Sequence, residues 1–104
     1  MKSYNVLITE KAKTDIVEIT RYISEDLLDT TAASRLLMKF EDAISGLSTM
    51  PERHEIVRDE WAGSRHIRKL LIDNYIVFYM IDGSALKVSV IRVLYMRRDW
   101  INLI

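Results

Sequence analysis

RHIRKLLIDNYIVFYMIDG, residues 65–83, leads into VSVIRVLYMRRDW, residues 88–100, and together these stretches decide the fold. Both place apolar residues at alternate positions and separate the runs with turn residues, as neighbouring strands do. We expect strands at 67–72, 75–81 and 86–94. Asp73-Asn74 and Asp82-Gly83 supply the turns, because residues of these types tolerate tight-turn geometry. The C-terminal half is therefore predicted to be a meander of antiparallel strands.

Upstream of this meander, the sequence predicts one short strand and a helical hairpin. Thr9 follows the apolar run Val6-Leu7-Ile8 and has the hydroxyl of an N-cap. Asp29-Thr30-Thr31 provides turn and cap chemistry between the helices, and Met50-Pro51 ends the second, because a residue before proline is pushed out of helical geometry. Apolar residues recur every three or four positions in both helices, at Ala12, Ile16, Ile19, Ile23 and Leu27, then at Ala33, Leu37, Phe40, Ile44 and Leu47.

The predicted fold class is α+β, with element order β-α-α-β-β-β and a helical hairpin packed on one face of a small antiparallel sheet. The chain has 104 residues, of which 49% are hydrophobic, so we expect one domain spanning residues 1–104. Met38 and Met80 are expected to fill the core. No linker or repeat indicates a second domain.

Composition also narrows the classes of function. No apolar run reaches the roughly 20 residues that a membrane span requires, so we expect a cytoplasmic protein without membrane contact. The chain has no cysteine, which excludes disulfides and thiolate metal sites. There is no glycine-rich phosphate loop and no cluster of metal ligands at usable spacing, so we expect no cofactor and no metal.

Charge is unevenly distributed along the chain although the formal net charge is zero. Residues 1–50 carry six Lys and Arg against eight Asp and Glu, whereas residues 61–104 carry seven against three. A dedicated nucleic-acid binder is usually basic overall, so neutrality argues against that class. The basic C-terminal part can still contact a few phosphates or an acidic partner.

The candidate site residues are Arg65, Tyr95, Arg97, Arg98 and Trp100, which combine guanidinium groups with aromatic rings. Such side chains are typical anchors of protein–protein interfaces. A structural interpretation stands beside this one: Arg97 and Arg98 are solvated charges near Asp99, and Trp100 packs a C-terminal turn onto the sheet. Arg65 enters an apolar strand and must reach solvent or a partner, with Asp59 or Glu60 just upstream.

Several of these features, taken in order, resemble the RelE/ParE toxin superfamily of bacterial toxin–antitoxin modules. They are the Met50-Pro51 break, Gly63-Ser64-Arg65 before a strand, Asn74-Tyr75 through Phe78-Tyr79, and Arg92-Val93-Leu94-Tyr95 followed by Arg97-Arg98-Asp99. The resemblance covers nearly the whole chain. The Tyr-x-x-Phe-Tyr strand and the Arg-Val-Leu-x-x-Arg-Arg-Asp ending are more similar to the ParE branch than to the ribonuclease branch.

The resemblance implies a growth-arresting toxin held inactive by a cognate antitoxin. Members similar to ParE act on DNA gyrase, whereas members similar to RelE cut messenger RNA at the ribosome. The antitoxin of such a module wraps the toxin's helical hairpin and sheet with a flexible tail, and it contacts operator DNA, so the toxin reaches that DNA only through the antitoxin. A dimer and a heteromeric complex with the antitoxin are both compatible with the sequence.

An endoribonuclease needs a proton acceptor, a proton donor and a cation facing the charge that develops on the phosphate. The catalytic candidates for that alternative are Arg65, Tyr95, Arg97 and Arg98. Arginine carries protons poorly because its pKa exceeds about 12, and Tyr95 stands where many relatives have a histidine. His54 and His66 match no catalytic position of the family. A third alternative is a non-toxic binding module of the same fold.

Overall fold

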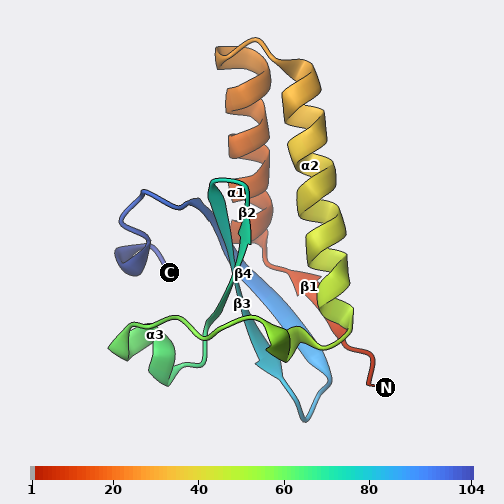
Figure 1. The fold of residues 1–104 in the computed structure, drawn as a ribbon, viewed down its shortest axis with the longest axis vertical. Coiled ribbons are helices and arrows are strands. Elements are labelled where there is room, and N and C mark those ends of the chain that lie inside the picture. Colours follow the sequence, from red (N-terminus) through yellow and green to blue (C-terminus); the bar gives the residue numbers. More distant parts are fainter. Residues whose placement is uncertain (1) are drawn as a thin grey trace.

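A computed structural model describes residues 2–104, in which two antiparallel helices stand on one face of a four-stranded sheet (Figure 1). β1 and α1 are followed by a single π-helical segment, η1, and by the long helix α2. Three short 3₁₀ segments and the five-residue helix α3 lie outside the hairpin. The elements are β1 (Asn5–Ile8), α1 (Glu10–Arg21), η1 (Tyr22–Asp26), α2 (Thr30–Ser45), η2 (Gly46–Ser48), η3 (Pro51–Arg53), α3 (Glu60–Ser64), β2 (Arg68–Ile72), β3 (Tyr75–Asp82), β4 (Lys87–Tyr95) and η4 (Trp100–Asn102).

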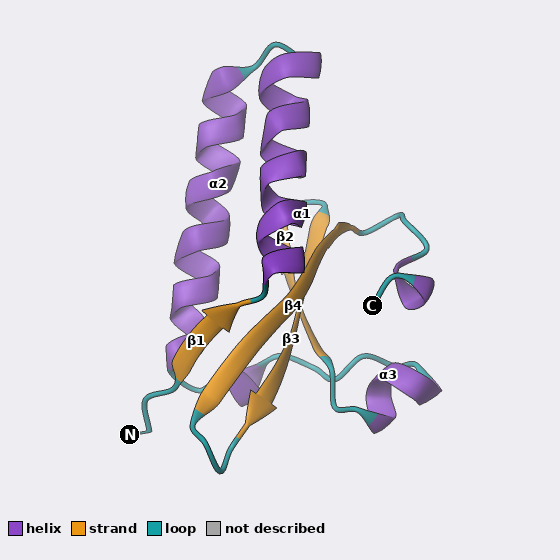
Figure 2. Cartoon of the chain, turned by 180° about the vertical axis from the view of Figure 1, so that it is seen from behind, coloured by secondary structure: helices purple, strands orange, loops and turns teal. Residues whose placement is uncertain are grey.

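The sheet has strand order β1-β4-β3-β2. β2, β3 and β4 form the predicted antiparallel meander. β1 pairs parallel with β4, so the expectation of a wholly antiparallel sheet is wrong for this strand (Figure 2). The reason is the path of the chain: the two helices return it to the end where β1 began, so β2 runs in the direction of β1, and the meander gives β4 that same direction. The predicted α+β class and element order are confirmed.

The predicted helix caps are present. The Thr9 hydroxyl accepts a hydrogen bond from the Ala12 N–H at 3.2 Å. The Asp29 carboxylate accepts one from the Ala32 N–H at 2.9 Å. The expectation that Met50-Pro51 ends the second helix is only approximate, because α2 ends at Ser45 and the short η2 at Ser48; Met50, just before Pro51, adopts a left-handed φ of 48°. The Thr9 and Asp29 contacts satisfy N–H groups of the first helical turn that have no partner within the helix.

Two positions of the predicted helical stripes are wrong, and so is one predicted core methionine. Leu27 lies beyond η1 and is 56% exposed, because π-helical turns advance the chain by a different angle and carry it out of register. Leu36 rather than Leu37 is buried in α2, where two adjacent leucines made the phase ambiguous. Met38 follows them on the outer face and is 64% exposed. Met80 packs against the core of the far face.

Each face of the sheet has its own apolar core. Val88, Val90 and Val93 belong to the core under the helices, whereas Phe78 and Leu94 belong to the core of the far face. A β-bulge shifts the register between Phe78 and Tyr79, where Phe78 pairs with Arg92 but Tyr79 pairs with Val90. The extra residue, Ile91, reverses which positions of β4 face the helices. After the bulge, Val93 therefore belongs to the core under the helices and Leu94 to the far-face core.

Within residues 2–104, none of the helices combines the length and the apolar character needed to cross a membrane.

Candidate functional site

The α1–β4 hollow is an open depression of about 550 Å³ between α1 and the ends of β3 and β4. Its size falls within the range of small ligand sites. The wall is partly apolar and partly aromatic, with ionisable groups from the helix and from the turn after β4. The lining residues are Asp15, Glu18, Ile19, Tyr22, Tyr75, Val93, Leu94, Tyr95 and Arg98.

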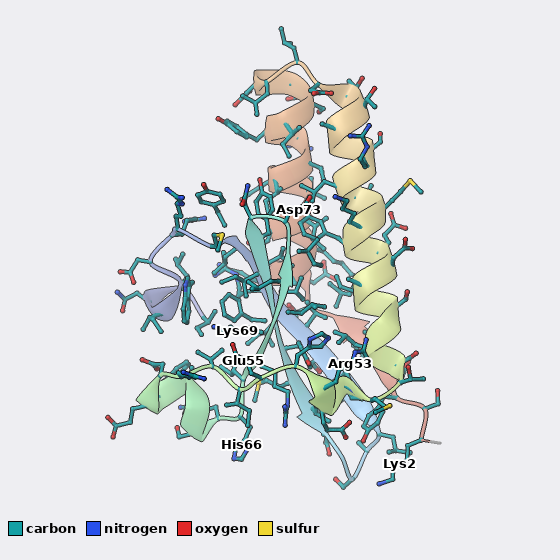
Figure 3. All side chains as sticks on the ribbon, in the orientation of Figure 1. Lys2, Arg53, Glu55, His66, Lys69 and Asp73 are labelled. Carbon is teal, nitrogen blue, oxygen red and sulfur yellow. The ribbon has the colours of Figure 1, made fainter. Side chains whose placement is uncertain are left out.

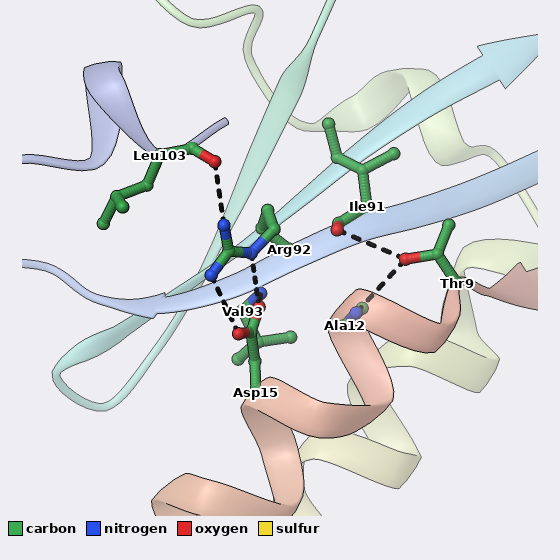
Figure 4. Close-up of polar contacts among 7 residues, drawn as sticks. All are labelled: Thr9, Ala12, Asp15, Ile91, Arg92, Val93 and Leu103. Atoms are coloured by element: carbon green, nitrogen blue, oxygen red, sulfur yellow. Dashed lines mark hydrogen bonds and ion pairs between the residues drawn. The ribbon is translucent and has the colours of Figure 1, made fainter.

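A buried ion pair holds the two sides of the hollow together (Figure 4). Asp15, only 7% exposed, accepts hydrogen bonds from Arg92 Nε at 2.7 Å and from Arg92 Nη2 at 2.9 Å. The Val93 N–H donates to the same carboxylate at 3.0 Å. These hydrogen bonds raise the pKa of the Arg92 guanidinium above its ordinary value. Bidentate pairs of this kind are among the strongest polar contacts in proteins.

The ion pair also reaches the C-terminal segment. Arg92 Nη1 donates to the Leu103 carbonyl at 2.8 Å, as Figure 4 shows. One guanidinium therefore joins α1, β4 and the residues after η4. Because Arg92 lies just three residues before Tyr95, this network fixes the end of β4 from which the hollow's wall is built.

Aromatic rings form the floor of the hollow. Tyr75 and Tyr95 face each other across the β3–β4 pair, with ring centroids 5.8 Å apart in an edge arrangement. Tyr75 makes a second edge contact with Phe40 of α2, also at 5.8 Å. Burial, followed by the neighbouring Tyr95, raises the pKa of the Tyr75 phenol. Tyr95 itself is 39% exposed, so its ring is both supported and accessible.

The structure brings together only some of the candidate residues. Tyr95 and Arg98 line the hollow, and the Arg98 N–H donates to the Tyr95 carbonyl at 3.0 Å. Arg97 is exposed on the same turn but does not line the hollow. Trp100 is half-buried, with its ring 5.3 Å from that of Phe78, and packs against the far-face core. Its environment matches the structural interpretation of a C-terminal turn folded back on the sheet.

Arg65 lies in a different region, which we call the α3 arm (residues 57–67). Its guanidinium stacks 4.4 Å from the ring centroid of Trp61 in a cation–π contact. The expectation that Arg65 opens a strand is wrong, because the chain first makes α3 and a turn, and β2 begins at Arg68. Asp59 does not pair with it; it caps α3 by accepting from the Ala62 N–H at 2.9 Å.

The two histidines also lie outside the hollow's lining. His66 is exposed beside α3, at the opposite end of the sheet from Asp73 (Figure 3). His54 packs edge-on against Tyr79 at 6.3 Å, and its Nε2 is buried without a hydrogen-bond partner. Burial, with Arg53 and Arg68 nearby, lowers the pKa of His54. Neither imidazole is placed to transfer a proton beside Tyr95 or Arg98.

Asp15, Glu18, Tyr22, Tyr75 and Arg92 are site residues that the sequence interpretation missed. The signal for the ion pair was available. Asp15 lies on the same helical face as Ala12, Ile16 and Ile19, and Arg92 interrupts a run of strand-forming residues. A carboxylate on a core-facing stripe and a guanidinium inside a strand each need a partner when buried, which predicts that they pair.

The hollow is suited to binding. In the lining, Asp15 and Glu18 supply negative charges and Arg98 a positive one. Arg92, which is outside the lining, pairs with Asp15, so the ionisable groups around the hollow balance. An RNA backbone prefers a positive surface, whereas aromatic rings beside an arginine are typical of protein-binding anchors. Among residues 2–104, no cluster of three or more His, Asp or Glu side chains has the arrangement of a metal site.

Comparisons with known proteins identify the family. Residues 6–100 match the model of the ParE toxin of the type II toxin–antitoxin system parDE. No match was found among curated proteins. The chain is similar to a structure of the chromosomal ParDE toxin–antitoxin system from P. aeruginosa, with a TM-score of 0.74, 14% identity, and coverage of 91% of this chain and 98% of that one.

A second similar structure comes from the toxin–antitoxin complex RelBE2 of Mycobacterium tuberculosis, with a TM-score of 0.61 and 24% identity. That alignment covers 91% of this chain and 93% of the other. At these identities the two structures establish the shared fold, and the family model, which spans most of the chain, establishes the relationship. The predicted resemblance is confirmed, and the chain belongs to the ParE toxin family of type II toxin–antitoxin systems.

Proposed function

We propose that this protein is a cytoplasmic growth-arresting toxin that acts on DNA gyrase and is neutralised by a cognate antitoxin. The observation that carries the choice of target is the α1–β4 hollow, where Tyr95 and Arg98 stand beside Tyr22 and Tyr75 in a charge-balanced setting. A toxin that blocks another enzyme needs a complementary surface with aromatic and arginine anchors. It does not need a tuned proton donor.

The ribonuclease alternative fits this setting less well. A phosphodiester in the hollow would lie near the exposed Glu18 carboxylate, which repels it, whereas the one arginine in the lining is Arg98. Tyr22, Tyr75 and Tyr95 supply the hydroxyl groups of the lining, and burial raises the pKa of Tyr75, which makes it a weaker acid. A group of this kind gives little general-acid catalysis near neutral pH.

We propose that the antitoxin binds around the α1–β4 hollow and also at a second place on the toxin. Both structures compared above come from toxin–antitoxin systems, which supports an antitoxin partner for this chain. A separate apolar groove lies between β1 and the helical hairpin, lined by Val6, Ile8, Ile16, Leu37, Phe40 and Ile44 together with Glu41 and Ser45. We propose that a flexible tail of the antitoxin follows this groove. The toxin then contacts operator DNA only through the antitoxin.

A gyrase supercoiling assay tests the proposal. Purified wild-type protein should inhibit supercoiling, and Arg98→Glu should lose at least tenfold in potency because it reverses the charge beside Tyr95. Arg58→Glu is the matched control, since the Arg58 side chain is 89% exposed and makes only a 4.0 Å contact with Glu55. It should inhibit like the wild type. Cleaved messenger RNA in a translating extract, with supercoiling unaffected, would contradict the proposal and support the ribonuclease.

A further inference from the structure

β1 covers only the first part of the outer edge of β4. The β1–β4 pairing ends at Ile8 and Val90. The chain then turns into α1 at Thr9, whose N–H donates to the Val90 carbonyl at 3.0 Å and whose hydroxyl donates to the Ile91 carbonyl at 3.2 Å. Beyond this point, within the described residues, β4 has no strand on that side as far as Tyr95.

The direction of the main-chain groups along this free edge follows from two hydrogen bonds. The Met96 N–H points toward β3, since it donates to the Asn74 carbonyl at 2.9 Å. The Val93 N–H points the other way, toward α1, since it donates to Asp15 at 3.0 Å. Alternate residues of a strand direct their N–H and C=O groups to opposite sides. Val93 and Tyr95 therefore direct theirs toward α1 and the hollow.

Part of this edge is already satisfied. The Asp15 carboxylate takes the place of a neighbouring strand for the Val93 N–H. The Tyr95 carbonyl accepts from the Arg98 N–H. What remains is the Val93 carbonyl and the Tyr95 N–H, one acceptor and one donor on either side of Leu94. Leu94 lines the hollow although its side chain is buried in the far-face core, which indicates that main-chain atoms form this wall.

We infer that the hollow binds an extended segment of the target enzyme as a short strand added to β4, in line with β1 and parallel to β4. In this arrangement one segment residue lies opposite Leu94. Its N–H donates to the Val93 carbonyl, and its carbonyl accepts from the Tyr95 N–H. Antiparallel pairing opposite Val93 would instead compete with Asp15 for the Val93 N–H. Strand addition of this kind gives affinity through the main chain.

The walls indicate which side chain the segment presents. Ile19, Tyr22, Tyr75 and Tyr95 offer apolar and aromatic surface. Glu18 and Arg98 balance in charge, and the second carboxylate of the lining, Asp15, is paired with Arg92. An uncharged, apolar side chain therefore fits best. This inference rests on the proposed function, because Tyr95 and Arg98, the two candidate residues that the fold brings together, are the reason to assign the hollow to the target.

Hydrogen exchange of single amides tests the inference directly. The wild-type protein is mixed with purified gyrase, and exchange is followed by mass spectrometry with fragmentation that resolves individual residues. The Tyr95 amide should exchange at least tenfold more slowly in the complex, because it gains an acceptor. The Leu94 and Met96 amides already point toward β3 and should change little. Equal rates at Tyr95 with and without bound gyrase would overturn the inference.

A steric variant gives a second, independent readout. Glu18→Trp places an indole at the hollow from the exposed face of α1 and should reduce gyrase inhibition at least tenfold. Asp42→Trp is the matched control, because Asp42 is also an exposed helical carboxylate and is outside the hollow's lining. It should inhibit like the wild type. Inhibition by Glu18→Trp at wild-type potency would contradict an occupied hollow.

The outcomes separate this inference from the proposed function. If the wild type does not inhibit gyrase, the proposed function fails and the inference fails with it. If the wild type inhibits but the Tyr95 amide is unchanged, gyrase remains the target and strand addition is refuted. If the purified antitoxin slows the Tyr95 amide and gyrase does not, the hollow belongs to the antitoxin, and its assignment to the target is overturned.

Discussion

The α1–β4 hollow and the α3 arm both present an arginine and an exposed aromatic ring, yet they are built differently. In the hollow, Tyr95 rests on Tyr75, and the buried Asp15–Arg92 pair fixes the strand that carries it. In the arm, Arg65 stacks on Trp61, which belongs to the five-residue helix α3. The same residue types therefore form a supported, concave surface in one region and an exposed stack in the other. Support from neighbouring elements, more than residue type, distinguishes a candidate site.

Removing the Asp15–Arg92 ion pair, which supports the hollow, should cause the largest loss of stability. Asp15→Ala leaves the Arg92 guanidinium and the Val93 N–H without their shared acceptor, and should lower the free energy of unfolding by about 3–5 kcal/mol. Urea unfolding followed by circular dichroism measures this change. Asp42→Ala, at an exposed position of α2, should change it by less than about 0.5 kcal/mol. Equal effects of the two variants would show that the ion pair does not support the hollow.

Removing the indole of Trp100 should separate stability from target binding. Trp100→Ala withdraws a half-buried ring from Phe78 and should lower the free energy of unfolding by about 2 kcal/mol, less than for a fully buried aromatic residue. At a temperature where the variant remains folded, gyrase inhibition should stay within about threefold of the wild type. A large loss of inhibition by the folded variant would show that Trp100 is part of the surface that contacts gyrase.

Exposed aromatic residues of the two regions provide a matched pair. Tyr95 is 39% exposed in the hollow and Trp61 is 45% exposed in the arm. Tyr95→Ala should weaken gyrase inhibition by about 30-fold, equivalent to an interface anchor worth about 2 kcal/mol. Trp61→Ala should leave inhibition unchanged. The reverse order of effects would place the contact surface on the arm.

Arg65 is expected to contribute modestly, and to stability alone. Arg65→Ala removes an exposed cation–π contact and should lower the free energy of unfolding by about 0.5–1 kcal/mol. Thermal unfolding detects a change of this size, and Trp61→Ala in the same background should add little, because the two side chains share one contact. Additive losses would mean that the stack does not stabilise the arm.

The smallest expected effect is on the pH dependence of stability, through His54, which precedes the arm in the chain. Burial lowers the pKa of His54, so the unfolded chain binds a proton at a higher pH than the folded protein does. Stability should therefore decrease as the pH falls below the ordinary histidine pKa of about 6.5. His54→Gln should flatten the urea-unfolding profile between about pH 5 and 7. A profile that is unchanged in this variant would assign the slope to other groups.

The strands, turns and helix caps could be predicted from sequence because they depend on local patterns. Thr9, Asp29 and the Asp73-Asn74 turn act within a few residues of themselves. The hollow could not be predicted in the same way. The Ile91 bulge reverses which residues of β4 face the helices, and period-two alternation alone does not reveal it. Asp15 and Arg92 are 77 positions apart, so only the folded arrangement shows that they pair.

In the α3 arm, the sequence interpretation includes a candidate residue, Arg65, that does not line the hollow. The sequence pattern places Gly63-Ser64-Arg65 at the entrance of a strand, but this segment is the end of a short helix. Glycine is favoured at position 63, because a Cβ there would lie 3.0 Å from the Val57 carbonyl oxygen, a tight contact with main chain. In the sequence, such a close approach between main-chain segments is marked by the glycine alone. The sequence pattern therefore groups Arg65 with Tyr95 and Arg98, although Arg65 does not line the hollow.

Site-specific photo-crosslinking compares the two regions most directly. Tyr22 lines the hollow and Trp61 lies on the arm, and both are about half exposed, at 53% and 45%. Each is replaced in turn by p-benzoylphenylalanine, and the protein is illuminated with purified gyrase. We expect a crosslink to gyrase from position 22 and none from position 61. A crosslink from position 61 alone, or equal yields from both, would contradict the assignment of the hollow as the surface that binds the target.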